Sequence, residues 1–167
     1  GGYELFADSN TTLFFLAQWF PRLVAYSDYE GWHNKAFLGR GEFTLEFGDY
    51  DVALTVPDNH VVSGTGELTN GRDVLSKEQR RRLAAVTSQS PSFIVTPQEA
   101  KNNEATQATG TKTWRFSARN VRDFAWASSS TLIWDGMLHE QPGAAPPNVL
   151  AMSCYPNDAE PVWSTYS

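Results

Sequence analysis

Cysteine is nearly absent from this sequence of 167 residues, which contains only Cys154. One thiol cannot form an internal disulfide, and it cannot supply a zinc site built on cysteine ligands. Cys154 lies in the apolar run 149–155, which predicts a strand. Free cysteine in such a run usually packs as a small hydrophobic residue. We therefore expect a buried structural thiol rather than a nucleophile.

Histidine is also scarce, and the three present are His33, His60 and His139. The zinc-peptidase motif H-E-x-x-H needs two histidines one helical turn apart, with a glutamate beside them as the base. The pair His139-Glu140 begins such a motif, but Gly143 occupies the fifth position and Pro142 would break the helix. The serine nucleophile motif G-x-S-x-G is absent as well. The sequence therefore predicts no catalytic residue and no metal site within this chain.

Basic charge and long apolar runs are both in short supply. The formal net charge is −6, which argues against a general nucleic-acid binder. The densest basic run, 80–82, falls in a helical pattern and is interpreted as a solvated helix face. The apolar run 13–17 is far shorter than the roughly 20 residues that a membrane span needs. No positively charged n-region and no small-residue cleavage site precede it, so it does not resemble a signal peptide.

Aromatic residues are abundant, at 13% of the chain, with 6 tryptophans, 6 tyrosines and 10 phenylalanines. Such residues favour strands and interfaces. The tryptophans could form a platform on which sugar rings stack. Packing in a core or an interface is the more common role of tryptophan in strands, and we favour it here.

Short alternating or apolar segments predict about eight to ten strands. In 43–47 the apolar residues occupy odd positions, whereas after Gly48 they occupy even positions from Tyr50 to Val56. A bulge at Gly48 in one long bent strand would absorb this switch, and we prefer it to a Gly48-Asp49 hairpin. Further strands are predicted at 60–68, 92–95, 114–118, 123–127, 131–134 and 149–155.

Two helices have clear start signals. Ser76 with Gln79 forms a capping box ahead of a helix over 77–88. Thr96, Pro97 and Glu99 mark the start of a second helix, which we expect to end near residue 106. The predicted fold is mainly β, an antiparallel sandwich or saddle-like sheet with a small two-helix insertion over about 76–106.

A series of aromatic and glycine-containing segments follows in a fixed order: 18–22, 26–32, 37–43, 47–57, 62–68, 113–116 and 121–128. In order and spacing they resemble the N-terminal β-domain of bacterial gluzincin zinc aminopeptidases, the aminopeptidase N type. The resemblance covers nearly the whole chain. It implies that residues 1–167 are one partial N-terminal domain and that a catalytic domain follows after residue 167. The abrupt ends at Gly1 and Ser167 agree with this expectation.

The resemblance also implies a function. In that family the N-terminal domain is not catalytic, packs on the catalytic domain that carries the zinc, and caps the active site. A Gln or Glu of this domain holds the free α-amino group of the peptide substrate. Gln18, four residues before Arg22 and ten before Asp28, is the best match to that position. The parent protein is expected to be periplasmic or secreted.

Two other functions stay open. The chain could be a stand-alone β-sandwich that binds carbohydrate through its tryptophans, or a scaffold domain of an inactive peptidase homologue. A reading frame that continues past Ser167 into H-E-x-x-H would favour the aminopeptidase. We also expect an exposed sheet edge, through which the isolated chain could self-associate.

Overall fold

The computed structural model describes residues 1–6, 11–34, 36, 39, 44–145 and 147–166. These residues form a mainly β structure in which all paired strands are antiparallel. The predicted fold class, with its small helical insertion, is therefore confirmed. None of the described helices has the length and apolar character that crossing a bilayer would require.

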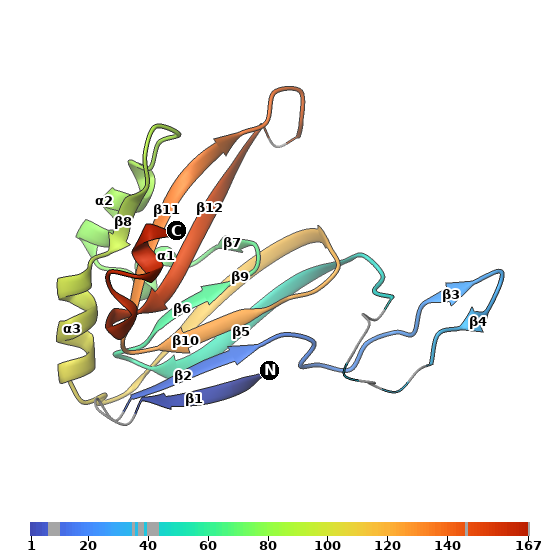
Figure 1. Ribbon diagram of the computed structural model, residues 1–167, viewed down its shortest axis with the longest axis horizontal. Coiled ribbons are helices and arrows are strands. Elements are labelled where there is room, and N and C mark those ends of the chain that lie inside the picture. Colours follow the sequence, from blue (N-terminus) through green and yellow to red (C-terminus); the bar gives the residue numbers. More distant parts are fainter. Residues whose placement is uncertain (7–10, 35, 37–38, 40–43, 146, 167) are drawn as a thin grey trace.

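Three sheets and one small hairpin make up the β structure (Figure 1). The first sheet has the order β1-β2-β10-β6, formed by Gly2–Phe6, Thr11–Leu16, Trp126–Ser129 and Val61–Gly64. The second has the order β5-β9-β7, formed by Gly48–Pro57, Thr111–Val121 and Glu67–Leu68. The third has the order β12-β11-β8, formed by Asn148–Pro156, Leu132–Glu140 and Ser92–Val95. The hairpin pairs β3 (Tyr26–Ser27) with β4 (Gly31–Trp32) and projects away from the sheets.

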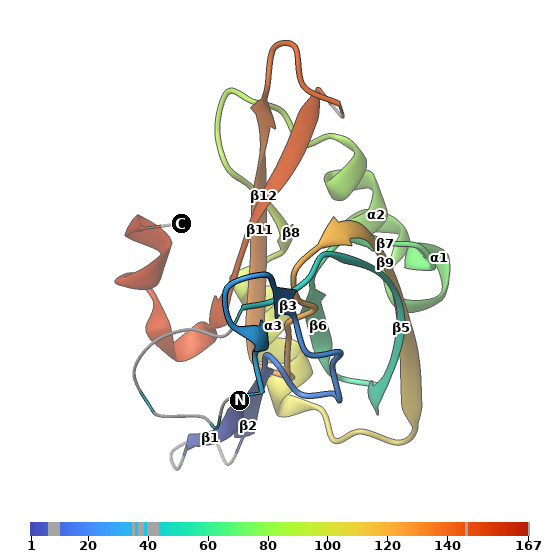
Figure 2. The same ribbon diagram turned by 90° about the vertical axis from the view of Figure 1, so that its right-hand side faces the viewer.

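The helical elements are α1 (Gly71–Val74), α2 (Lys77–Ala84), α3 (Pro97–Ala105) and the 3₁₀ turns η1 (Asn157–Ala159) and η2 (Trp163–Thr165). Both predicted capping boxes are present, at Ser76 and at Thr96. The first predicted helix ends at Ala84 rather than at residue 88, and α1 was not predicted. A single four-residue turn is too short to show a helical period in the sequence. Figure 2 shows η1 and η2 on the opposite side of the β11–β12 hairpin from β5 and β9.

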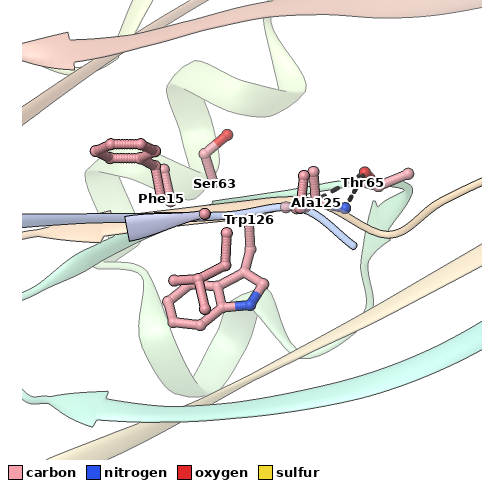
Figure 3. Close-up of a pocket in the computed structure, with 10 residues that line it drawn as sticks. Phe15, Ser63, Thr65, Ala125 and Trp126 are labelled. Atoms are coloured by element: carbon pink, nitrogen blue, oxygen red, sulfur yellow. Dashed lines mark hydrogen bonds between the residues drawn. The ribbon is translucent and has the colours of Figure 1, made fainter. Parts of the chain in front are cut away.

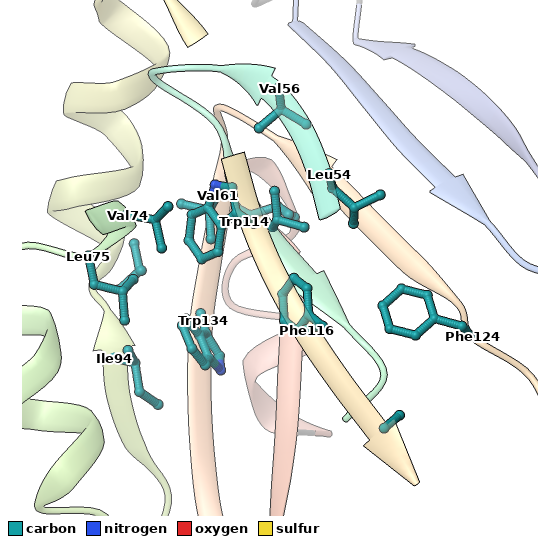
Figure 4. Packing of buried hydrophobic residues seen from close by; sticks show 14 of the residues in the cluster. Leu54, Val56, Val61, Val74, Leu75, Ile94, Trp114, Phe116, Phe124 and Trp134 are labelled. Carbon is teal, nitrogen blue, oxygen red and sulfur yellow. The ribbon is translucent and has the colours of Figure 1, made fainter. Parts of the chain in front are cut away.

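The core lies between the sheets and the inner faces of the helices (Figure 4). Apolar side chains from β5, β6, β8, β9, β11 and α1 meet there, because alternate residues of each strand point inward. The largest of the fully buried side chains are Trp114, Tyr155, Phe124, Ile94, Leu132 and Ile133. Trp114 and Trp134 belong to this core, as the favoured role of the tryptophans predicts.

A register shift occurs between Gly48 and Tyr50, but it is not the predicted bulge, because its extra residue lies on the partner strand. Gly48 pairs with Val121 and Tyr50 pairs with Ala118, so β9 contains the additional residue. Asn120 takes a left-handed conformation there, with φ of 54°, which asparagine tolerates better than most residues. The prediction of one long strand through 44–47 was wrong, since β5 begins at Gly48; Phe43 lies outside the described residues.

The expected exposed edge is found at β1, which has a strand partner on one side only among the described residues. Its side chains Tyr3 and Leu5 are 71% and 58% exposed. Self-association of the chain through this edge stays a prediction.

An ion pair joins two helices of the insertion. Arg82 on α2 donates to both carboxylate oxygens of Glu99 on α3, at 2.6 Å and 2.7 Å. The basic run 80–82 is therefore not a uniformly solvated face, because the Arg82 side chain is only 18% exposed. Burial pushes the pKa of Glu99 upward, but the hydrogen bonds from Arg82 and from the Thr96 backbone outweigh it and hold the pKa below its usual value.

Glu99→Gln is expected to lower the free energy of unfolding by about 1–2 kcal/mol at pH 7. A carboxyl whose pKa is lower in the folded state stabilises the fold above its ordinary value of 4.5, and this contribution is lost as the pH falls through the folded pKa. The difference between wild type and variant should therefore shrink below pH 4.5 in thermal unfolding experiments. Glu78→Gln is the matched control, because its pair with Arg81 is exposed and screened by solvent. Equal losses from the two variants would contradict this prediction.

Candidate functional site

Gln18 lies at an exposed corner where the chain leaves β2. Its backbone has φ of 51°, in the left-handed region. For a residue with a side chain this conformation costs about 1–2 kcal/mol, and glutamine lacks the special tolerance of glycine or asparagine. The surroundings must therefore hold the corner in place.

The carboxylate of Asp123 provides this restraint. Its Oδ2 accepts the backbone N–H of Gln18 at 3.0 Å, and its Oδ1 accepts Nη1 of Arg22 at 2.7 Å. Arg22 also donates through Nη2 to the carbonyl of Arg122 and, at 3.3 Å, to the hydroxyl of Tyr50. Hydrogen bonds to a charged group contribute about 1.5–3 kcal/mol each, which is enough to outweigh the backbone strain at Gln18. Both ends of the segment 18–22 are thus tied to one carboxylate.

Aromatic side chains also pack around the corner formed by residues 18–22. The indole of Trp19 donates to the carbonyl of Phe124 at 2.9 Å and meets the ring of Trp126 edge to face, with centroids 6.3 Å apart. Phe20 packs edge to face on Trp19 at 5.4 Å and on Tyr50 at 5.5 Å. Such pairs are worth about 0.5–1.5 kcal/mol beyond their buried area. The corner therefore sits on a connected aromatic cluster that leads into the core.

A shallow hollow of about 470 Å³ lies on the sheet beside this corner. It is lined by Gly1, Phe15, Leu16, Ala17, Ser63, Gly64, Thr65, Ala125, Trp126 and Ala127. Figure 3 shows Phe15 and Ser63 on one side of the sheet and the Trp126 indole on the other. Gln18 directly follows Ala17, one of the lining residues, in the chain.

Thr65 and Ala125 close one end of the hollow. The Thr65 N–H donates to the Ala125 carbonyl at 3.0 Å, and the Ala125 N–H donates to Thr65 Oγ1 at 3.1 Å (Figure 3). Gly66 follows with φ of 88°, and there the chain passes from β6 in the first sheet to β7 in the second. The predicted single strand over 60–68 is therefore two strands in two sheets. This turn fixes the segment that leads back from Ala125 to Asp123.

The exposed Gln18 side chain offers hydrogen-bonding groups at this corner. The Gln18 side chain makes no hydrogen bond to another described residue, so its carbonyl and amide groups face solvent. A side-chain carbonyl accepts hydrogen bonds from an ammonium group. The charged groups nearby, Arg22 and Asp123, are already paired with each other.

The histidines lie on separate elements. His33 contacts Ser27 at 2.7 Å, His60 contacts Ser128 at 2.9 Å, and His139 is exposed on β11. Over residues 1–6, 11–34, 36, 39, 44–145 and 147–166, no three His, Cys, Asp or Glu side chains come together as a metal site.

Cys154 lies on β12, where burial raises the pKa of its thiol to about 12. The thiol is therefore protonated at neutral pH and is a poor nucleophile. The expectation of a buried residue is met only in part, because Cys154 as a whole is half-buried.

Gln18 was predicted as a site residue, and that role stays a prediction; the sequence did not indicate the hollow or the contact between Gln18 and Asp123. The two residues are 105 positions apart, and only the pairing of β2 with β10 brings their neighbourhoods together. An aspartate just before an apolar strand carries no local signal of such a contact. Of the six tryptophans, Trp19, Trp32 and Trp163 are at least 40% exposed, so core packing accounts for only part of the set.

Comparisons of the chain with protein-family models, with curated protein sequences and with solved structures yield no match.

Proposed function

We propose that this chain is the non-catalytic N-terminal β-domain of a zinc metallo-aminopeptidase-like protein. In this proposal it caps the active site of a following catalytic domain and anchors the N-terminus of the peptide substrate through Gln18. The supporting observation is the position of Gln18, whose amide is exposed at a corner that Asp123 and Arg22 hold rigid. Gln18 itself was selected by the resemblance of its segment to that family, from its spacing to Arg22 and Asp28.

The geometry suits this task. The free α-ammonium of a peptide has three N–H donors, and the Gln18 carbonyl can accept one of them. A fixed backbone lowers the conformational entropy that binding would otherwise remove. In this proposal the zinc belongs to the catalytic domain and the parent protein is periplasmic or secreted.

Gln18→Ala in the full-length protein is expected to raise the KM for aminoacyl substrates about tenfold, since a hydrogen bond to a charged group is removed. A smaller change in kcat is expected if the contact is equally strong in the ground and transition states. Gln98→Ala is the control, because Gln98 is an exposed glutamine on α3 that bonds only within its own helix among the described residues. An unchanged KM for Gln18→Ala would remove the anchoring role.

The parent reading frame offers a simple first test. A continuation past Ser167 into H-E-x-x-H supports an active aminopeptidase, and a continuation without the histidines supports the scaffold of an inactive homologue. A frame that stops at Ser167 contradicts both.

One observation favours a second candidate, a carbohydrate-binding module. Tyr26 and Trp32 form a cross-strand pair on the projecting β3–β4 hairpin, with centroids 5.1 Å apart and exposures of 59% and 68%. Exposed aromatic pairs on a rigid hairpin can stack on sugar rings. Binding to a glycan array that Trp32→Ala abolishes and Trp163→Ala leaves intact would favour this candidate over the first.

A further inference from the structure

We propose that Asp123 is a positioning residue, whose carboxylate keeps the Gln18 backbone left-handed and so fixes where the Gln18 side chain points. Its consequence for substrate binding rests on the function proposed above. Its effect on the backbone is a property of this chain alone and can be measured without a catalytic domain.

The backbone of Gln18 is strained and must be held by a contact. A glutamine at φ of 51° needs a compensating contact, and in the described structure the contact to its N–H is Asp123 Oδ2 at 3.0 Å. A carboxylate is a stronger acceptor than a neutral group, so it can hold a strained residue. If this contact is removed, we expect the residue to relax toward the extended or right-handed regions that glutamine prefers.

The carboxylate of Asp123 is itself held in place. Its other oxygen, Oδ1, is bound by Arg22 at 2.7 Å, and Arg22 is held in turn by Tyr50 and by the carbonyl of Arg122. The side chains of Arg22 and Asp123 are 16% and 20% exposed, so water screens the pair only weakly. The carboxylate therefore cannot rotate away without breaking its bond to Arg22.

A second contact, between Phe124 and Trp19, lies next to the contact between Asp123 and Gln18. The next residue, Phe124, is fully buried, and its carbonyl accepts the indole N–H of Trp19. Two consecutive residues, Asp123 and Phe124, thus bind two consecutive residues, Gln18 and Trp19. This double connection sets both the position and the orientation of the corner.

A second aspartate binds the N–H of a left-handed residue in the same way, and this pair serves as an internal control. Asn120 is left-handed with φ of 54°, and its N–H is bound by Asp49 Oδ1 at 2.9 Å. An aspartate carboxylate therefore restrains each of the left-handed residues other than glycine that the described chain contains. Removing either aspartate should release its own partner and leave the other unchanged.

The first experiment is NMR on the 167-residue chain. A left-handed residue shows a strong intraresidue NOE between its amide and α protons. In Asp123→Ala we expect this NOE to weaken at Gln18 and its amide exchange to rise at least about tenfold, with Asn120 unchanged. Asp49→Ala should give the opposite pattern. A Gln18 that keeps its NOE and its slow exchange in Asp123→Ala overturns the proposal.

A conservative variant protects the test against loss of folding. Asp123→Asn keeps an oxygen that can accept the Gln18 N–H but loses the charge that binds Arg22. It should therefore retain part of the NOE and of the exchange protection. If Asp123→Asn behaves like wild type while Asp123→Ala loses the NOE, the hydrogen bond itself is the restraint. If Asp123→Asn loses the NOE at Asn120 as well as at Gln18, the effect is general and the proposal fails.

The second experiment is a double-mutant cycle in the full-length protein. Asp123→Ala should raise KM about as much as Gln18→Ala, and it should add little in the Gln18→Ala background. Asp49→Ala should leave KM unchanged. An equal rise of KM in both backgrounds would show that Asp123 acts independently of Gln18, which overturns the inference. If neither variant changes KM but the NMR result holds, the anchoring function fails while the positioning role stands.

Discussion

Phe124→Ala is expected to lower the free energy of unfolding by about 3–5 kcal/mol. Phe124 is 0% exposed and belongs to the main core cluster (Figure 4). Its ring meets Phe116 with centroids 6.1 Å apart and Tyr50 with centroids 6.3 Å apart. Truncation would leave a cavity against the face of the sheet formed by β5 and β9, which the paired strands cannot fill without breaking their pairing.

Phe124→Ala should also disturb the proposed site, because the Asp123 carboxylate binds Gln18 and the Phe124 carbonyl binds Trp19. Urea unfolding followed by tryptophan fluorescence would measure the stability, and KM in the full-length protein would report the site. Phe47→Ala is the matched control. Its ring is 55% exposed and contacts mainly Arg122, at 4.6 Å, an interaction worth about 0.5–1 kcal/mol. Similar losses from the two variants would show that Phe124 is not the anchor.

Features that depend on residues close together in the sequence were predicted at the right positions. The capping boxes at Ser76 and Thr96 place the starts of α2 and α3 at the predicted residues. The apolar run that became β12 was also located within one residue at each end. These features depend on neighbours in sequence, such as a side chain and an N–H three residues apart, so no tertiary information is needed.

Strand pairing between distant segments could not be predicted from the sequence in the same way. The parity switch at Gly48 was interpreted as a bulge within one long strand, but β5 begins at Gly48, and the register shift places the extra residue on β9, near Asn120. Residues 60–68 were predicted to form one strand, yet Gly66 separates β6 from β7, which belong to two different sheets. Sequence parity can say that a strand changes face, whereas the partner strand determines how.

At the candidate site, as in the fold, the contact between distant residues was not predicted. Gln18 was predicted as a substrate contact from the resemblance of its surrounding segment, and that role stays a prediction for a residue that is exposed in the structure. Its left-handed backbone and the bond to Asp123 were not predicted, because nothing near residue 18 indicates a partner at residue 123. A contact between residues 105 positions apart is found only in three dimensions.

Gly66→Ala is expected to be the other strongly destabilising change, by about 3–4 kcal/mol. The left-handed φ of 88° disfavours any side chain there. In addition, a Cβ would lie 2.4 Å from the Ser117 carbonyl oxygen and 2.7 Å from the Ala118 Cβ, so β9 would have to move. Because β9 is the central strand of its sheet, such a shift would disturb its pairing with both β5 and β7.

Gly143→Ala separates the two causes. Gly143 has a similar φ of 82°, but a Cβ added there would meet nothing within 4 Å. It should therefore show only the conformational cost, about 1–2 kcal/mol. The excess loss in Gly66→Ala, measured by urea unfolding, is then the steric term. Gly66→Ala should also speed amide exchange at Ala125, whose N–H is bound by Thr65 next to the turn. Equal destabilisation by both variants, with Ala125 still protected, would show that the close approach of Gly66 to β9 does not fix the wall of the hollow.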